Sequence, residues 1–403
     1  MRRIVSRTAL AVGVVALAMT ASVAGVHRAA ADSKGLGHVY VNLNTAGSSG
    51  NTVAAYDRQP GGSLIPAAGS PFAVGGSGTG GGLAAQGALQ LSSDGRYLLV
   101  ADAGSNRISV LRIRPDGSLR PVSGSPVSSG GIRPVSIAVH DNLVYVANAG
   151  SGGSNYAGFE LNEGGHLRPL AGSTVAAAPG VVDVLFSGDG THLAGVRVGT
   201  ATGGAAIDGT IDSFAVGANG LLSPAPGSPV TAQANGPFGS AFNPINSGQL
   251  FVTNAHAGPG NGSVSAFAVA ADSSLSPIGA SPYPNFQTAP CWLAVAPDGR
   301  HLYTSNTANN SLSEYAVNLN GTLALVANTV LSGTSSTLPN TRPIDLGVTP
   351  DGRDLYVIKA GSNAVGALTV NADGSLTELS GPSVSLPASG NGSASGIVVT
   401  GDD

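Results

Sequence analysis

Few side chains in this sequence could move protons, and three of them stand at positions that one site could share. Asp183 and Asp345 occupy equivalent places in a repeat described below, and two carboxylates could perform acid–base chemistry or hold a cation. The alternative is that each carboxylate accepts backbone N–H groups of its own loop. His256 lies in a long loop, 254–261, and could act as a general base near neutral pH. The plainer interpretation is a solvated loop histidine.

A second group of residues could bind a ligand rather than transform it. Arg133 and Arg342 each precede a proline at the start of a predicted strand, where they could clamp a carboxylate or phosphate or simply bond loop carbonyls. Ser136 and Trp292 occupy the same repeat position as the two aspartates and complete the candidate ligand-binding set. Cys291 could be a nucleophile beside Trp292, but no histidine is placed to activate it, which favours a packed apolar pair.

Familiar motifs for phosphate, zinc and acyl-transfer chemistry are missing. The sequence contains no Gly-x-x-x-x-Gly-Lys-Ser/Thr loop, no His-Glu-x-x-His and no Gly-x-Ser-x-Gly elbow. The glycine-rich stretch 75–82 has no helical pattern after it, so we interpret it as a loop and not as a phosphate cradle. We therefore expect neither a metal site nor a cofactor.

Composition narrows the fold class. The chain has 403 residues, of which 42% are hydrophobic and 10% charged, with 60 Gly and 25 Pro. The low charge excludes a coiled coil, and the ordinary apolar fraction excludes intrinsic disorder. Glycine and proline at this density favour an all-β chain with many tight turns. Because Cys291 is the only cysteine, no internal disulfide can form.

The first 31 residues have the three parts of a secretory signal peptide. Arg2, Arg3 and Arg7 precede an apolar run over 9–18, and small residues follow as far as Ala31. We expect cleavage and export to the periplasm, the cell surface or the medium, without membrane insertion because the apolar run is short. Removal of this segment takes away four arginines and changes the net charge from −4 to −8, which excludes a basic surface for nucleic acid.

Seven repeats of about 53 residues organise the rest of the chain. Each repeat has a Gly-x-Leu or Ser-Leu turn, with its leucine at Leu64, Leu119, Leu167, Leu222, Leu275, Leu323 and Leu376. A second marker is a β-rich segment that ends near Asn, such as 144–148, and an Asp-Gly turn precedes most copies. Four short strands per unit and seven units are typical of the blades of a β-propeller.

The two ends of the repeat region are complementary. The chain begins on a second strand, 38–42, and finishes on 396–400, which matches a first strand. Pairing of these segments would complete one blade and close the ring. We therefore predict an all-β fold: a single, monomeric seven-bladed β-propeller with four-stranded blades over residues 36–403, after a signal peptide over residues 1–31.

Such a fold would position the candidate residues together. In a propeller, the loops that lead into first strands and those between second and third strands share one face around the channel mouth. Ligand sites tend to form at concave mouths of this kind. We therefore expect Asp183, His256 and Asp345 to gather there with the two arginines.

The repeat motifs also resemble a known family. Tyr-Val-x-Asn strands, Pro-Asp-Gly-Arg turns (297–300 and 350–353) and Asp-Gly-Ser-Leu turns look like those of lactonase-type seven-bladed propellers, along residues 36–403. That family includes 6-phosphogluconolactonases and carboxymuconate cyclases, and it shades into surface proteins with Tyr-Val-Thr-Asn-type repeats. These are scaffold motifs, so the resemblance implies the fold more than the chemistry.

The sequence departs from the family at its catalytic positions. Catalytic members carry an Arg-His pair after a Gly-Pro, where this chain has Phe238 and Gly239. Ala255 stands where the family has a glutamate, and Ile344 stands where it has an arginine. These differences put sugar-lactone hydrolysis by the family mechanism in doubt.

Three functions fit these observations. The favoured one is an exported, non-catalytic propeller that binds a small ligand or a protein partner at the channel mouth. A divergent lactone hydrolase or cyclase would use His256 with Asp183 or Asp345 and an arginine clamp. A structural cell-surface element would need none of these residues.

Overall fold

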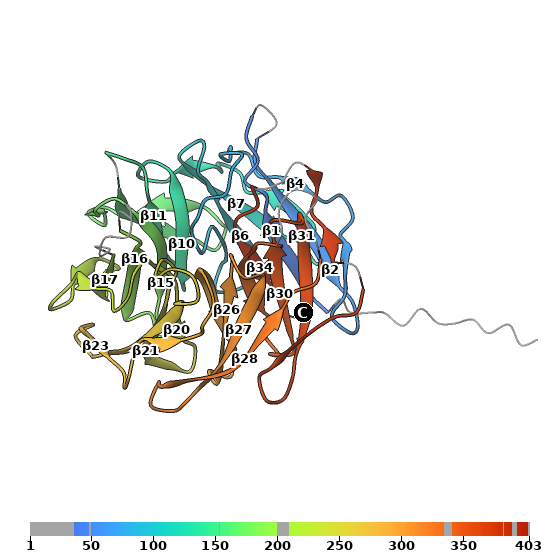
Figure 1. The fold of residues 1–403 in the computed structure, drawn as a ribbon. Helices are drawn as coiled ribbons and strands as arrows, with labels where there is room; N and C mark the ends of the chain where they lie inside the picture. The colour runs from blue at the N-terminus through green and yellow to red at the C-terminus, as the bar shows by residue number, and fades with distance from the viewer. Residues whose placement is uncertain are drawn as a thin grey trace, which may run out of the picture. The chain divides into compact units, whose positions relative to one another are not determined.

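The predicted strand repeats form seven antiparallel sheets, arranged as blades around a central channel, in a computed structural model of the chain (Figure 1). The structure describes residues 36–47, 50–152, 154–199, 209–333, 341–381, 383–388 and 393–401. The predicted signal peptide, residues 1–31, lies outside these ranges. Within them, no helix is long and apolar enough to cross a membrane.

The first three blades follow one another along the chain, apart from one strand contributed by the C-terminus. Blade 1 consists of β34 (Ile397–Val399), β1 (His38–Asn42), β2 (Thr52–Arg58), β3 (Leu64–Pro66) and β4 (Phe72–Ala73). Blade 2 consists of β5 (Leu89–Leu91), β6 (Tyr97–Asp102), β7 (Arg107–Ile113), β8 (Leu119–Pro121) and β9 (Val127–Ser128). Blade 3 consists of β10 (Pro134–His140), β11 (Leu143–Asn148), β12 (Asn155–Leu161), β13 (Leu167–Pro169) and β14 (Val175–Ala176).

The other four blades are each continuous in sequence. Blade 4 consists of β15 (Val181–Phe186), β16 (His192–Arg197), β17 (Thr210–Val216), β18 (Leu222–Pro224) and β19 (Val230–Thr231). Blade 5 consists of β20 (Pro237–Asn243), β21 (Asn246–Asn254), β22 (Ser263–Val269), β23 (Leu275–Pro277) and β24 (Tyr283–Pro284). Blade 6 consists of β25 (Pro290–Val295), β26 (His301–Asn306), β27 (Ser311–Val317) and β28 (Leu323–Val330). Blade 7 consists of β29 (Pro343–Val348), β30 (Asp354–Lys359), β31 (Ala364–Val370), β32 (Leu376–Glu378) and β33 (Val384–Ser385).

In six blades the predicted fourth strand is broken into a three-residue piece and a two-residue piece, and both pair with the third strand. In five of them a serine in the intervening turn replaces the missing strand partner. The Oγ of Ser70, for example, accepts the backbone N–H of Ala55 at 2.8 Å, and Ser125 does the same for Val110 at 2.7 Å. The break therefore leaves these third-strand amides satisfied.

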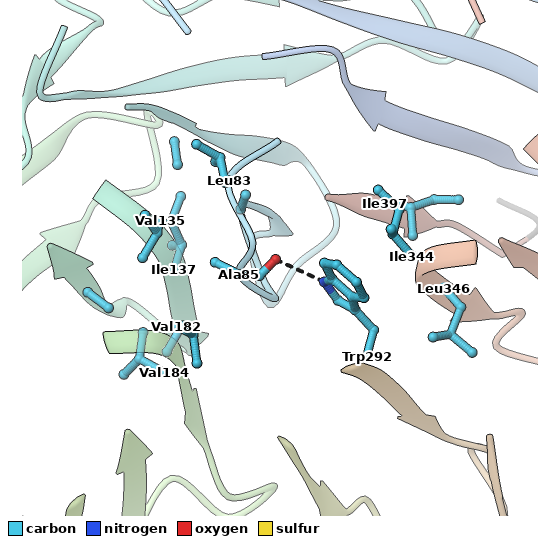
Figure 2. Close-up of a cluster of buried hydrophobic side chains, with 14 of the residues drawn as sticks. Leu83, Ala85, Val135, Ile137, Val182, Val184, Trp292, Ile344, Leu346 and Ile397 are labelled. Atoms are coloured by element: carbon cyan, nitrogen blue, oxygen red, sulfur yellow. Dashed lines mark hydrogen bonds between the residues drawn. The ribbon is translucent and has the colours of Figure 1, made fainter. Parts of the chain in front are cut away.

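Apolar side chains occupy the centre of the ring. The first strands of successive blades lie beside one another all the way round, and β34 lies next to both β29 and β5. Their buried side chains, together with those of one loop, fill the channel end that carries the candidate site: Leu83, Ala85, Val135, Ile137, Val182, Val184, Trp292, Ile344, Leu346 and Ile397 (Figure 2).

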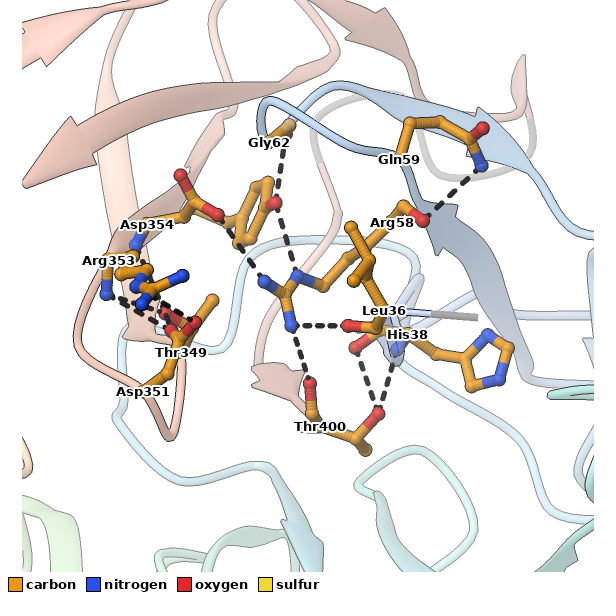
Figure 3. Close-up of polar contacts among 11 residues, drawn as sticks. Leu36, His38, Arg58, Gln59, Gly62, Thr349, Asp351, Arg353, Asp354 and Thr400 are labelled. Atoms are coloured by element: carbon orange, nitrogen blue, oxygen red, sulfur yellow. Dashed lines mark hydrogen bonds and ion pairs between the residues drawn. The ribbon is translucent and has the colours of Figure 1, made fainter. Parts of the chain in front are cut away.

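The ring closes as predicted, because β34 pairs antiparallel with β1, Tyr40 lying opposite Val398. Arg58 reinforces this closure from inside blade 1 (Figure 3). Its guanidinium donates to the carbonyl of Thr400 at 3.1 Å and forms an ion pair with Asp354 of blade 7 at 3.3 Å. Arg58 therefore binds the C-terminal strand and the last blade to the first.

Neighbouring blades also meet on the face opposite the channel mouth. In most blades a side chain near the start of the second strand packs against the glycine of a turn in the following blade, as His301 does against Gly374, whereas His192 of blade 4 meets Ser273. Buried tyrosines add hydrogen bonds along the same seams: Tyr40 donates to the carbonyl of Gly117 at 3.0 Å, and Tyr145 donates to that of Gly220 at 2.8 Å. These contacts need glycine both for its positive φ and for its missing β-carbon.

This packing predicts unequal costs for two similar substitutions. Gly95→Ala, at a φ of +70° with open space around it, should cost about 1 kcal/mol from backbone strain alone. Gly374→Ala, at a φ of +82°, should cost about 1–3 kcal/mol more, because the new methyl group would overlap the His301 ring. Chemical denaturation measures both losses. Adding His301→Ala should recover part of the Gly374→Ala loss, and equal losses for the two alanine variants would contradict the contact.

Candidate functional site

The first strands begin at the channel mouth with a shared backbone pattern. Five blades start with a residue of positive φ: Arg133 (56°), Gly180 (92°), Gly236 (68°), Ala289 (54°) and Arg342 (46°). An irregularity in strand register follows within a few residues in each of these blades. The sharp bend and the bulge direct the next side chains sideways, toward the neighbouring blade. Ser136, Asp183, Trp292 and Asp345 all stand just after such a bend.

Ser136 and Asp183 are brought together, as two links of a chain between first strands. Ser136 Oγ donates to Asp183 Oδ1 at 3.2 Å and accepts the backbone N–H of Val184 at 3.1 Å. Asp183 Oδ2 accepts the backbone N–H and the hydroxyl of Ser240, at 2.9 and 2.7 Å. Each side chain thus satisfies an inner-edge N–H of the following blade, which has no strand partner on that side.

Asp345 has the same position in blade 7 and fewer partners. Its Oδ1 accepts the backbone N–H of Leu346 at 3.0 Å, and the backbone of Ile397 in the next blade also lies within hydrogen-bonding reach. This resembles the alternative expected from the sequence, in which the carboxylate accepts local backbone groups. The side chain is buried, with 5% of the residue exposed.

Burial changes the protonation of both carboxyl groups. Loss of hydration raises the pKa of Asp183 to about 7, although its bonds to Ser240 and Ser136 act in the opposite direction. Loss of hydration also raises the pKa of Asp345 to about 8, and the charge of Asp183 contributes to that rise. The two groups are therefore close enough to influence each other, and both are partly protonated near neutral pH.

A loop that leads into blade 2 fills the mouth above these carboxyls. Within this plug, residues 83–88, the backbone N–H of Gln86 donates to the carbonyl of Val182 at 3.0 Å. The Gln86 side chain donates to the carbonyl of Ser240 at 2.7 Å and accepts the N–H of Leu293 at 3.0 Å. The plug therefore contacts blades 4, 5 and 6 on the far side of the channel from its own blade.

Two of the residues discussed from the sequence hold the plug in place. The indole N–H of Trp292 donates to the carbonyl of Ala85 at 2.9 Å (Figure 2). The Trp292 ring packs edge-to-face on Phe238, with the ring centroids 5.0 Å apart. At Gly239 a β-carbon would overlap the Gln86 amide oxygen, so only glycine leaves room for that side chain. The sequence analysis did not identify Gln86. The available signal was that blade 2 alone has Ala-Ala-Gln-Gly before its first strand.

The two arginines and His256 lie on the exposed face around the plug. Arg133 donates from its guanidinium to the carbonyl of Leu83 at 3.4 Å, and Arg342 stands in the same position before blade 7. The His256 ring lies against Gly236, and this partial burial lowers its pKa. Among the described residues, no hydrogen bond or ion pair joins His256 to either aspartate, so the structure does not assemble the three into one acid–base group.

Cys291 is packed rather than poised for reaction. Burial raises the pKa of its thiol to about 11, so a thiolate is scarce at neutral pH. This arrangement matches the packed apolar pair considered from the sequence. In the part of the chain that the structure describes, no three His, Cys, Asp or Glu side chains gather closely enough to hold a metal ion.

Charge is distributed unequally between the two faces of the ring. Across the described portions of the mouth-face loops no residue is acidic, and the cationic or titratable residues are Arg133, Arg342 and His256. The described turns of the opposite face carry nine acidic residues and four arginines: Asp94, Asp116, Asp141, Glu163, Asp189, Asp272, Asp298, Asp351 and Asp373, with Arg96, Arg114, Arg300 and Arg353. The described mouth-face loops thus carry basic residues without acidic ones, whereas the turns of the opposite face carry more acidic than basic residues.

Comparisons with known proteins agree with this architecture. The family model described as lactonase, 7-bladed beta-propeller, matches residues 50–186 and 230–393. No curated protein matches the sequence. A solved structure of a periplasmic gluconolactonase from Pseudomonas aeruginosa is similar, with a TM-score of 0.67 and 20% identity over 91% of this chain and all of that one. A Bacteroides fragilis protein, provisionally named a 6-phosphogluconolactonase, has a TM-score of 0.67 and 19% identity over 90% of this chain and 98% of that one. At these identities the structures show a shared fold.

The buried carboxyls predict how stability depends on pH. Between the pKa of an unfolded aspartate, about 4, and the folded value for Asp345, about 8, the folded chain holds a proton that the unfolded chain has lost. The free energy of unfolding should therefore fall as pH rises through this window. Asp345→Asn should flatten the fall in melting temperature from about pH 5 to pH 8. Asp116→Asn, at an exposed turn, should leave the slope unchanged, and a wild-type slope in Asp345→Asn would show that Asp345 titrates normally.

The plug predicts a second measurable effect. Gln86→Ala leaves a buried carbonyl and a buried N–H unpaired, which should cost about 1–3 kcal/mol for each group. Trp292 is the only tryptophan, so its fluorescence reports on the plug directly, and its emission should move to longer wavelength as water reaches the indole. Gln59→Ala, whose amide bonds only the neighbouring Arg58 carbonyl, serves as the control. Unchanged emission in Gln86→Ala would mean that the plug stays closed without its glutamine.

Proposed function

The chain belongs to the lactonase family of seven-bladed β-propellers, and we propose that it is an exported, non-hydrolytic member that binds an anionic small ligand or protein segment on its mouth face. The observation that carries this proposal is the plug. It fills with apolar contacts the place where the family resemblance puts catalytic side chains. A scaffold alone does not define an activity, so the residues at this site decide what the protein can do.

The residues at the family's catalytic positions cannot supply acid–base chemistry. Phe238 is buried and packs on Trp292, and Gly239 gives its space to the Gln86 side chain. Ala255 and Ile344 are buried apolar residues. None of these four side chains can donate a proton, accept one or hold an anion.

The basic residues above the plug support binding instead. Arg133 keeps its guanidinium near the edge of the plug, and Arg342 stands at the equivalent position of blade 7. Guanidinium groups form paired hydrogen bonds with carboxylates and phosphates. Because the described mouth-face loops carry these cations and no acidic residue, an anionic group suits this face as a ligand.

Export is part of the proposal and is supported by the sequence. The segment 1–31 has the composition of a signal peptide, and one structural neighbour is named as a periplasmic protein. An exported location also suits a chain with a single, partly buried cysteine, whose stability comes from packing and ring closure.

A second candidate, divergent lactone hydrolysis, rests on His256. Its ring is accessible on the mouth face, and its lowered pKa keeps the imidazole neutral, as a general base requires. It would act without help from Asp183 or Asp345, which are engaged with backbone groups below the plug.

One set of measurements separates the two functions. Mature protein incubated with glucono-δ-lactone and simple γ-lactones in a pH-stat should release acid no faster than buffer. Sodium gluconate, a carboxylate probe, should bind in a calorimetric titration. The double variant Arg133→Gln, Arg342→Gln should bind it at least about tenfold more weakly, because charge-assisted bonds are lost.

The matched control is Arg300→Gln, Arg353→Gln, which removes two arginines from the opposite face and should bind like the wild type. Acid release that disappears in His256→Ala would favour the hydrolase. Equal gluconate binding by both double variants would exclude the mouth face as the binding surface.

A further inference from the structure

The outer strand of blade 6 differs from that of every other blade. Six blades end in a three-residue piece and a two-residue piece with a turn between them, whereas β28 runs without a turn over eight residues. It pairs along the whole of β27, from Ser311 opposite Val330 to Val317 opposite Leu323. Among the strands of the described residues, β28 is the last of its sheet, and one of its edges has no strand partner there.

The devices that protect the other outer edges are missing from β28. In blades 1 to 5 the outer strand has a proline as its third residue, at Pro66, Pro121, Pro169, Pro224 and Pro277. Proline and charge at an edge prevent further strands from adding. The register places Leu325 where blade 2 has Pro121, since each lies opposite the corresponding third-strand residue, Tyr315 or Leu111. The sequence of β28, Leu-Ala-Leu-Val-Ala-Asn-Thr-Val, contains neither proline nor charge.

Exposed hydrophobic side chains gather along this strand. Val330 is 71% exposed and Val326 is 40% exposed, both on the side of β28 that faces solvent. Asn328, which lies between them, donates its side-chain amide to the carbonyl of Asn285 at 3.3 Å. This bond holds the adjacent Phe286, itself 66% exposed, near the upper end of the strand.

In residues 327–330 of β28, alternate backbone N–H and C=O groups point away from β27 and could pair with another strand. Leu331 donates its N–H to the carbonyl of Asn310, so its backbone groups face β27. Alternation along an antiparallel strand then directs those of Asn328 and Val330 to the open edge. Val326 is the extra residue of a bulge, because Leu325 lies opposite Tyr315 and Ala327 lies opposite Glu314. The regular ladder extends from Ala327 to Val330.

We propose that β28 pairs with β28 of a second copy of this chain, antiparallel and about a two-fold axis at Asn328. Two copies of β28 can lie side by side because the strand has no charged residue, so the pairing brings no like charges together. A register centred on Asn328 places Val330 of each copy beside Val326 of the other, which buries the exposed valines in pairs. The result is one continuous sheet across two blades, with both mouth faces left open. This proposal differs from the monomer expected from the sequence.

Sedimentation equilibrium over a wide concentration range tests the pairing. A ladder this short buries less area than a standard interface, so the dimer should be weak. The weight-average mass should rise toward that of two chains in a series reaching about 1 mM, where even an association of about 4 kcal/mol is visible. Val330→Lys should abolish the rise, because each lysine would be buried against Val326 of the other copy with no opposite charge to pair with. Ile65→Lys, at a 49% exposed residue of the β3 edge, should dimerise like the wild type.

A cysteine tests the register independently of affinity. In Asn328→Cys the new thiols of two copies should lie opposite each other and form an interchain disulfide under mild oxidation. The partly buried Cys291, with its raised pKa, stays protonated. Ile65→Cys should remain monomeric on a non-reducing gel. A wild type that stays monomeric at every concentration would overturn the proposal, and so would a Val330→Lys variant that still dimerises or an Asn328→Cys variant that does not crosslink.

Discussion

Satisfaction of backbone groups at strand edges is the constraint on which this structure depends. A ring of sheets has an inner edge in every blade and one seam where the chain ends meet. At the seam, β34 pairs with β1, and Arg58 binds both that strand and blade 7. At the inner edges, Ser136 and Asp183 reach across to the next blade's backbone. Without these contacts, backbone amides at the seam and at the inner edges of the blades would have no hydrogen-bond partner.

The same constraint gives the channel aspartates a structural role. A carboxylate that caps a backbone N–H inside an apolar ring must lose most of its hydration, and this raises the pKa of both Asp183 and Asp345. The groups that look most like a catalytic pair in the sequence are thus held below the plug by their own bonds. The accessible chemistry of the mouth belongs to the arginines and His256, which lie above it.

The plug explains how a family scaffold can keep its fold while its mouth changes character. The Gln86 side chain bonds the carbonyl of Ser240 and the N–H of Leu293, which water would bond in an open mouth. Trp292 holds the same loop through the carbonyl of Ala85. Gly239 and Phe238 are therefore a matched adaptation: the first admits Gln86, and the second packs against the indole. The outer edge of blade 6 also departs from the repeat, because β28 lacks the proline that the outer strands of blades 1 to 5 carry.

The sequence by itself determined the all-β class, the seven blades and the closure of the ring, because hydrophobic alternation and Asp-Gly turns act locally and recur with a fixed period. It also identified Asp183, Asp345 and Trp292 as equivalent inward positions. Only the tertiary structure decided what these residues do, since their partners are supplied by other blades: Ser240 for Asp183, and Ala85 for Trp292. The plug and the unbroken β28 could not be foreseen from the repeat, because each is a departure from it whose consequence depends on what lies beside it in space.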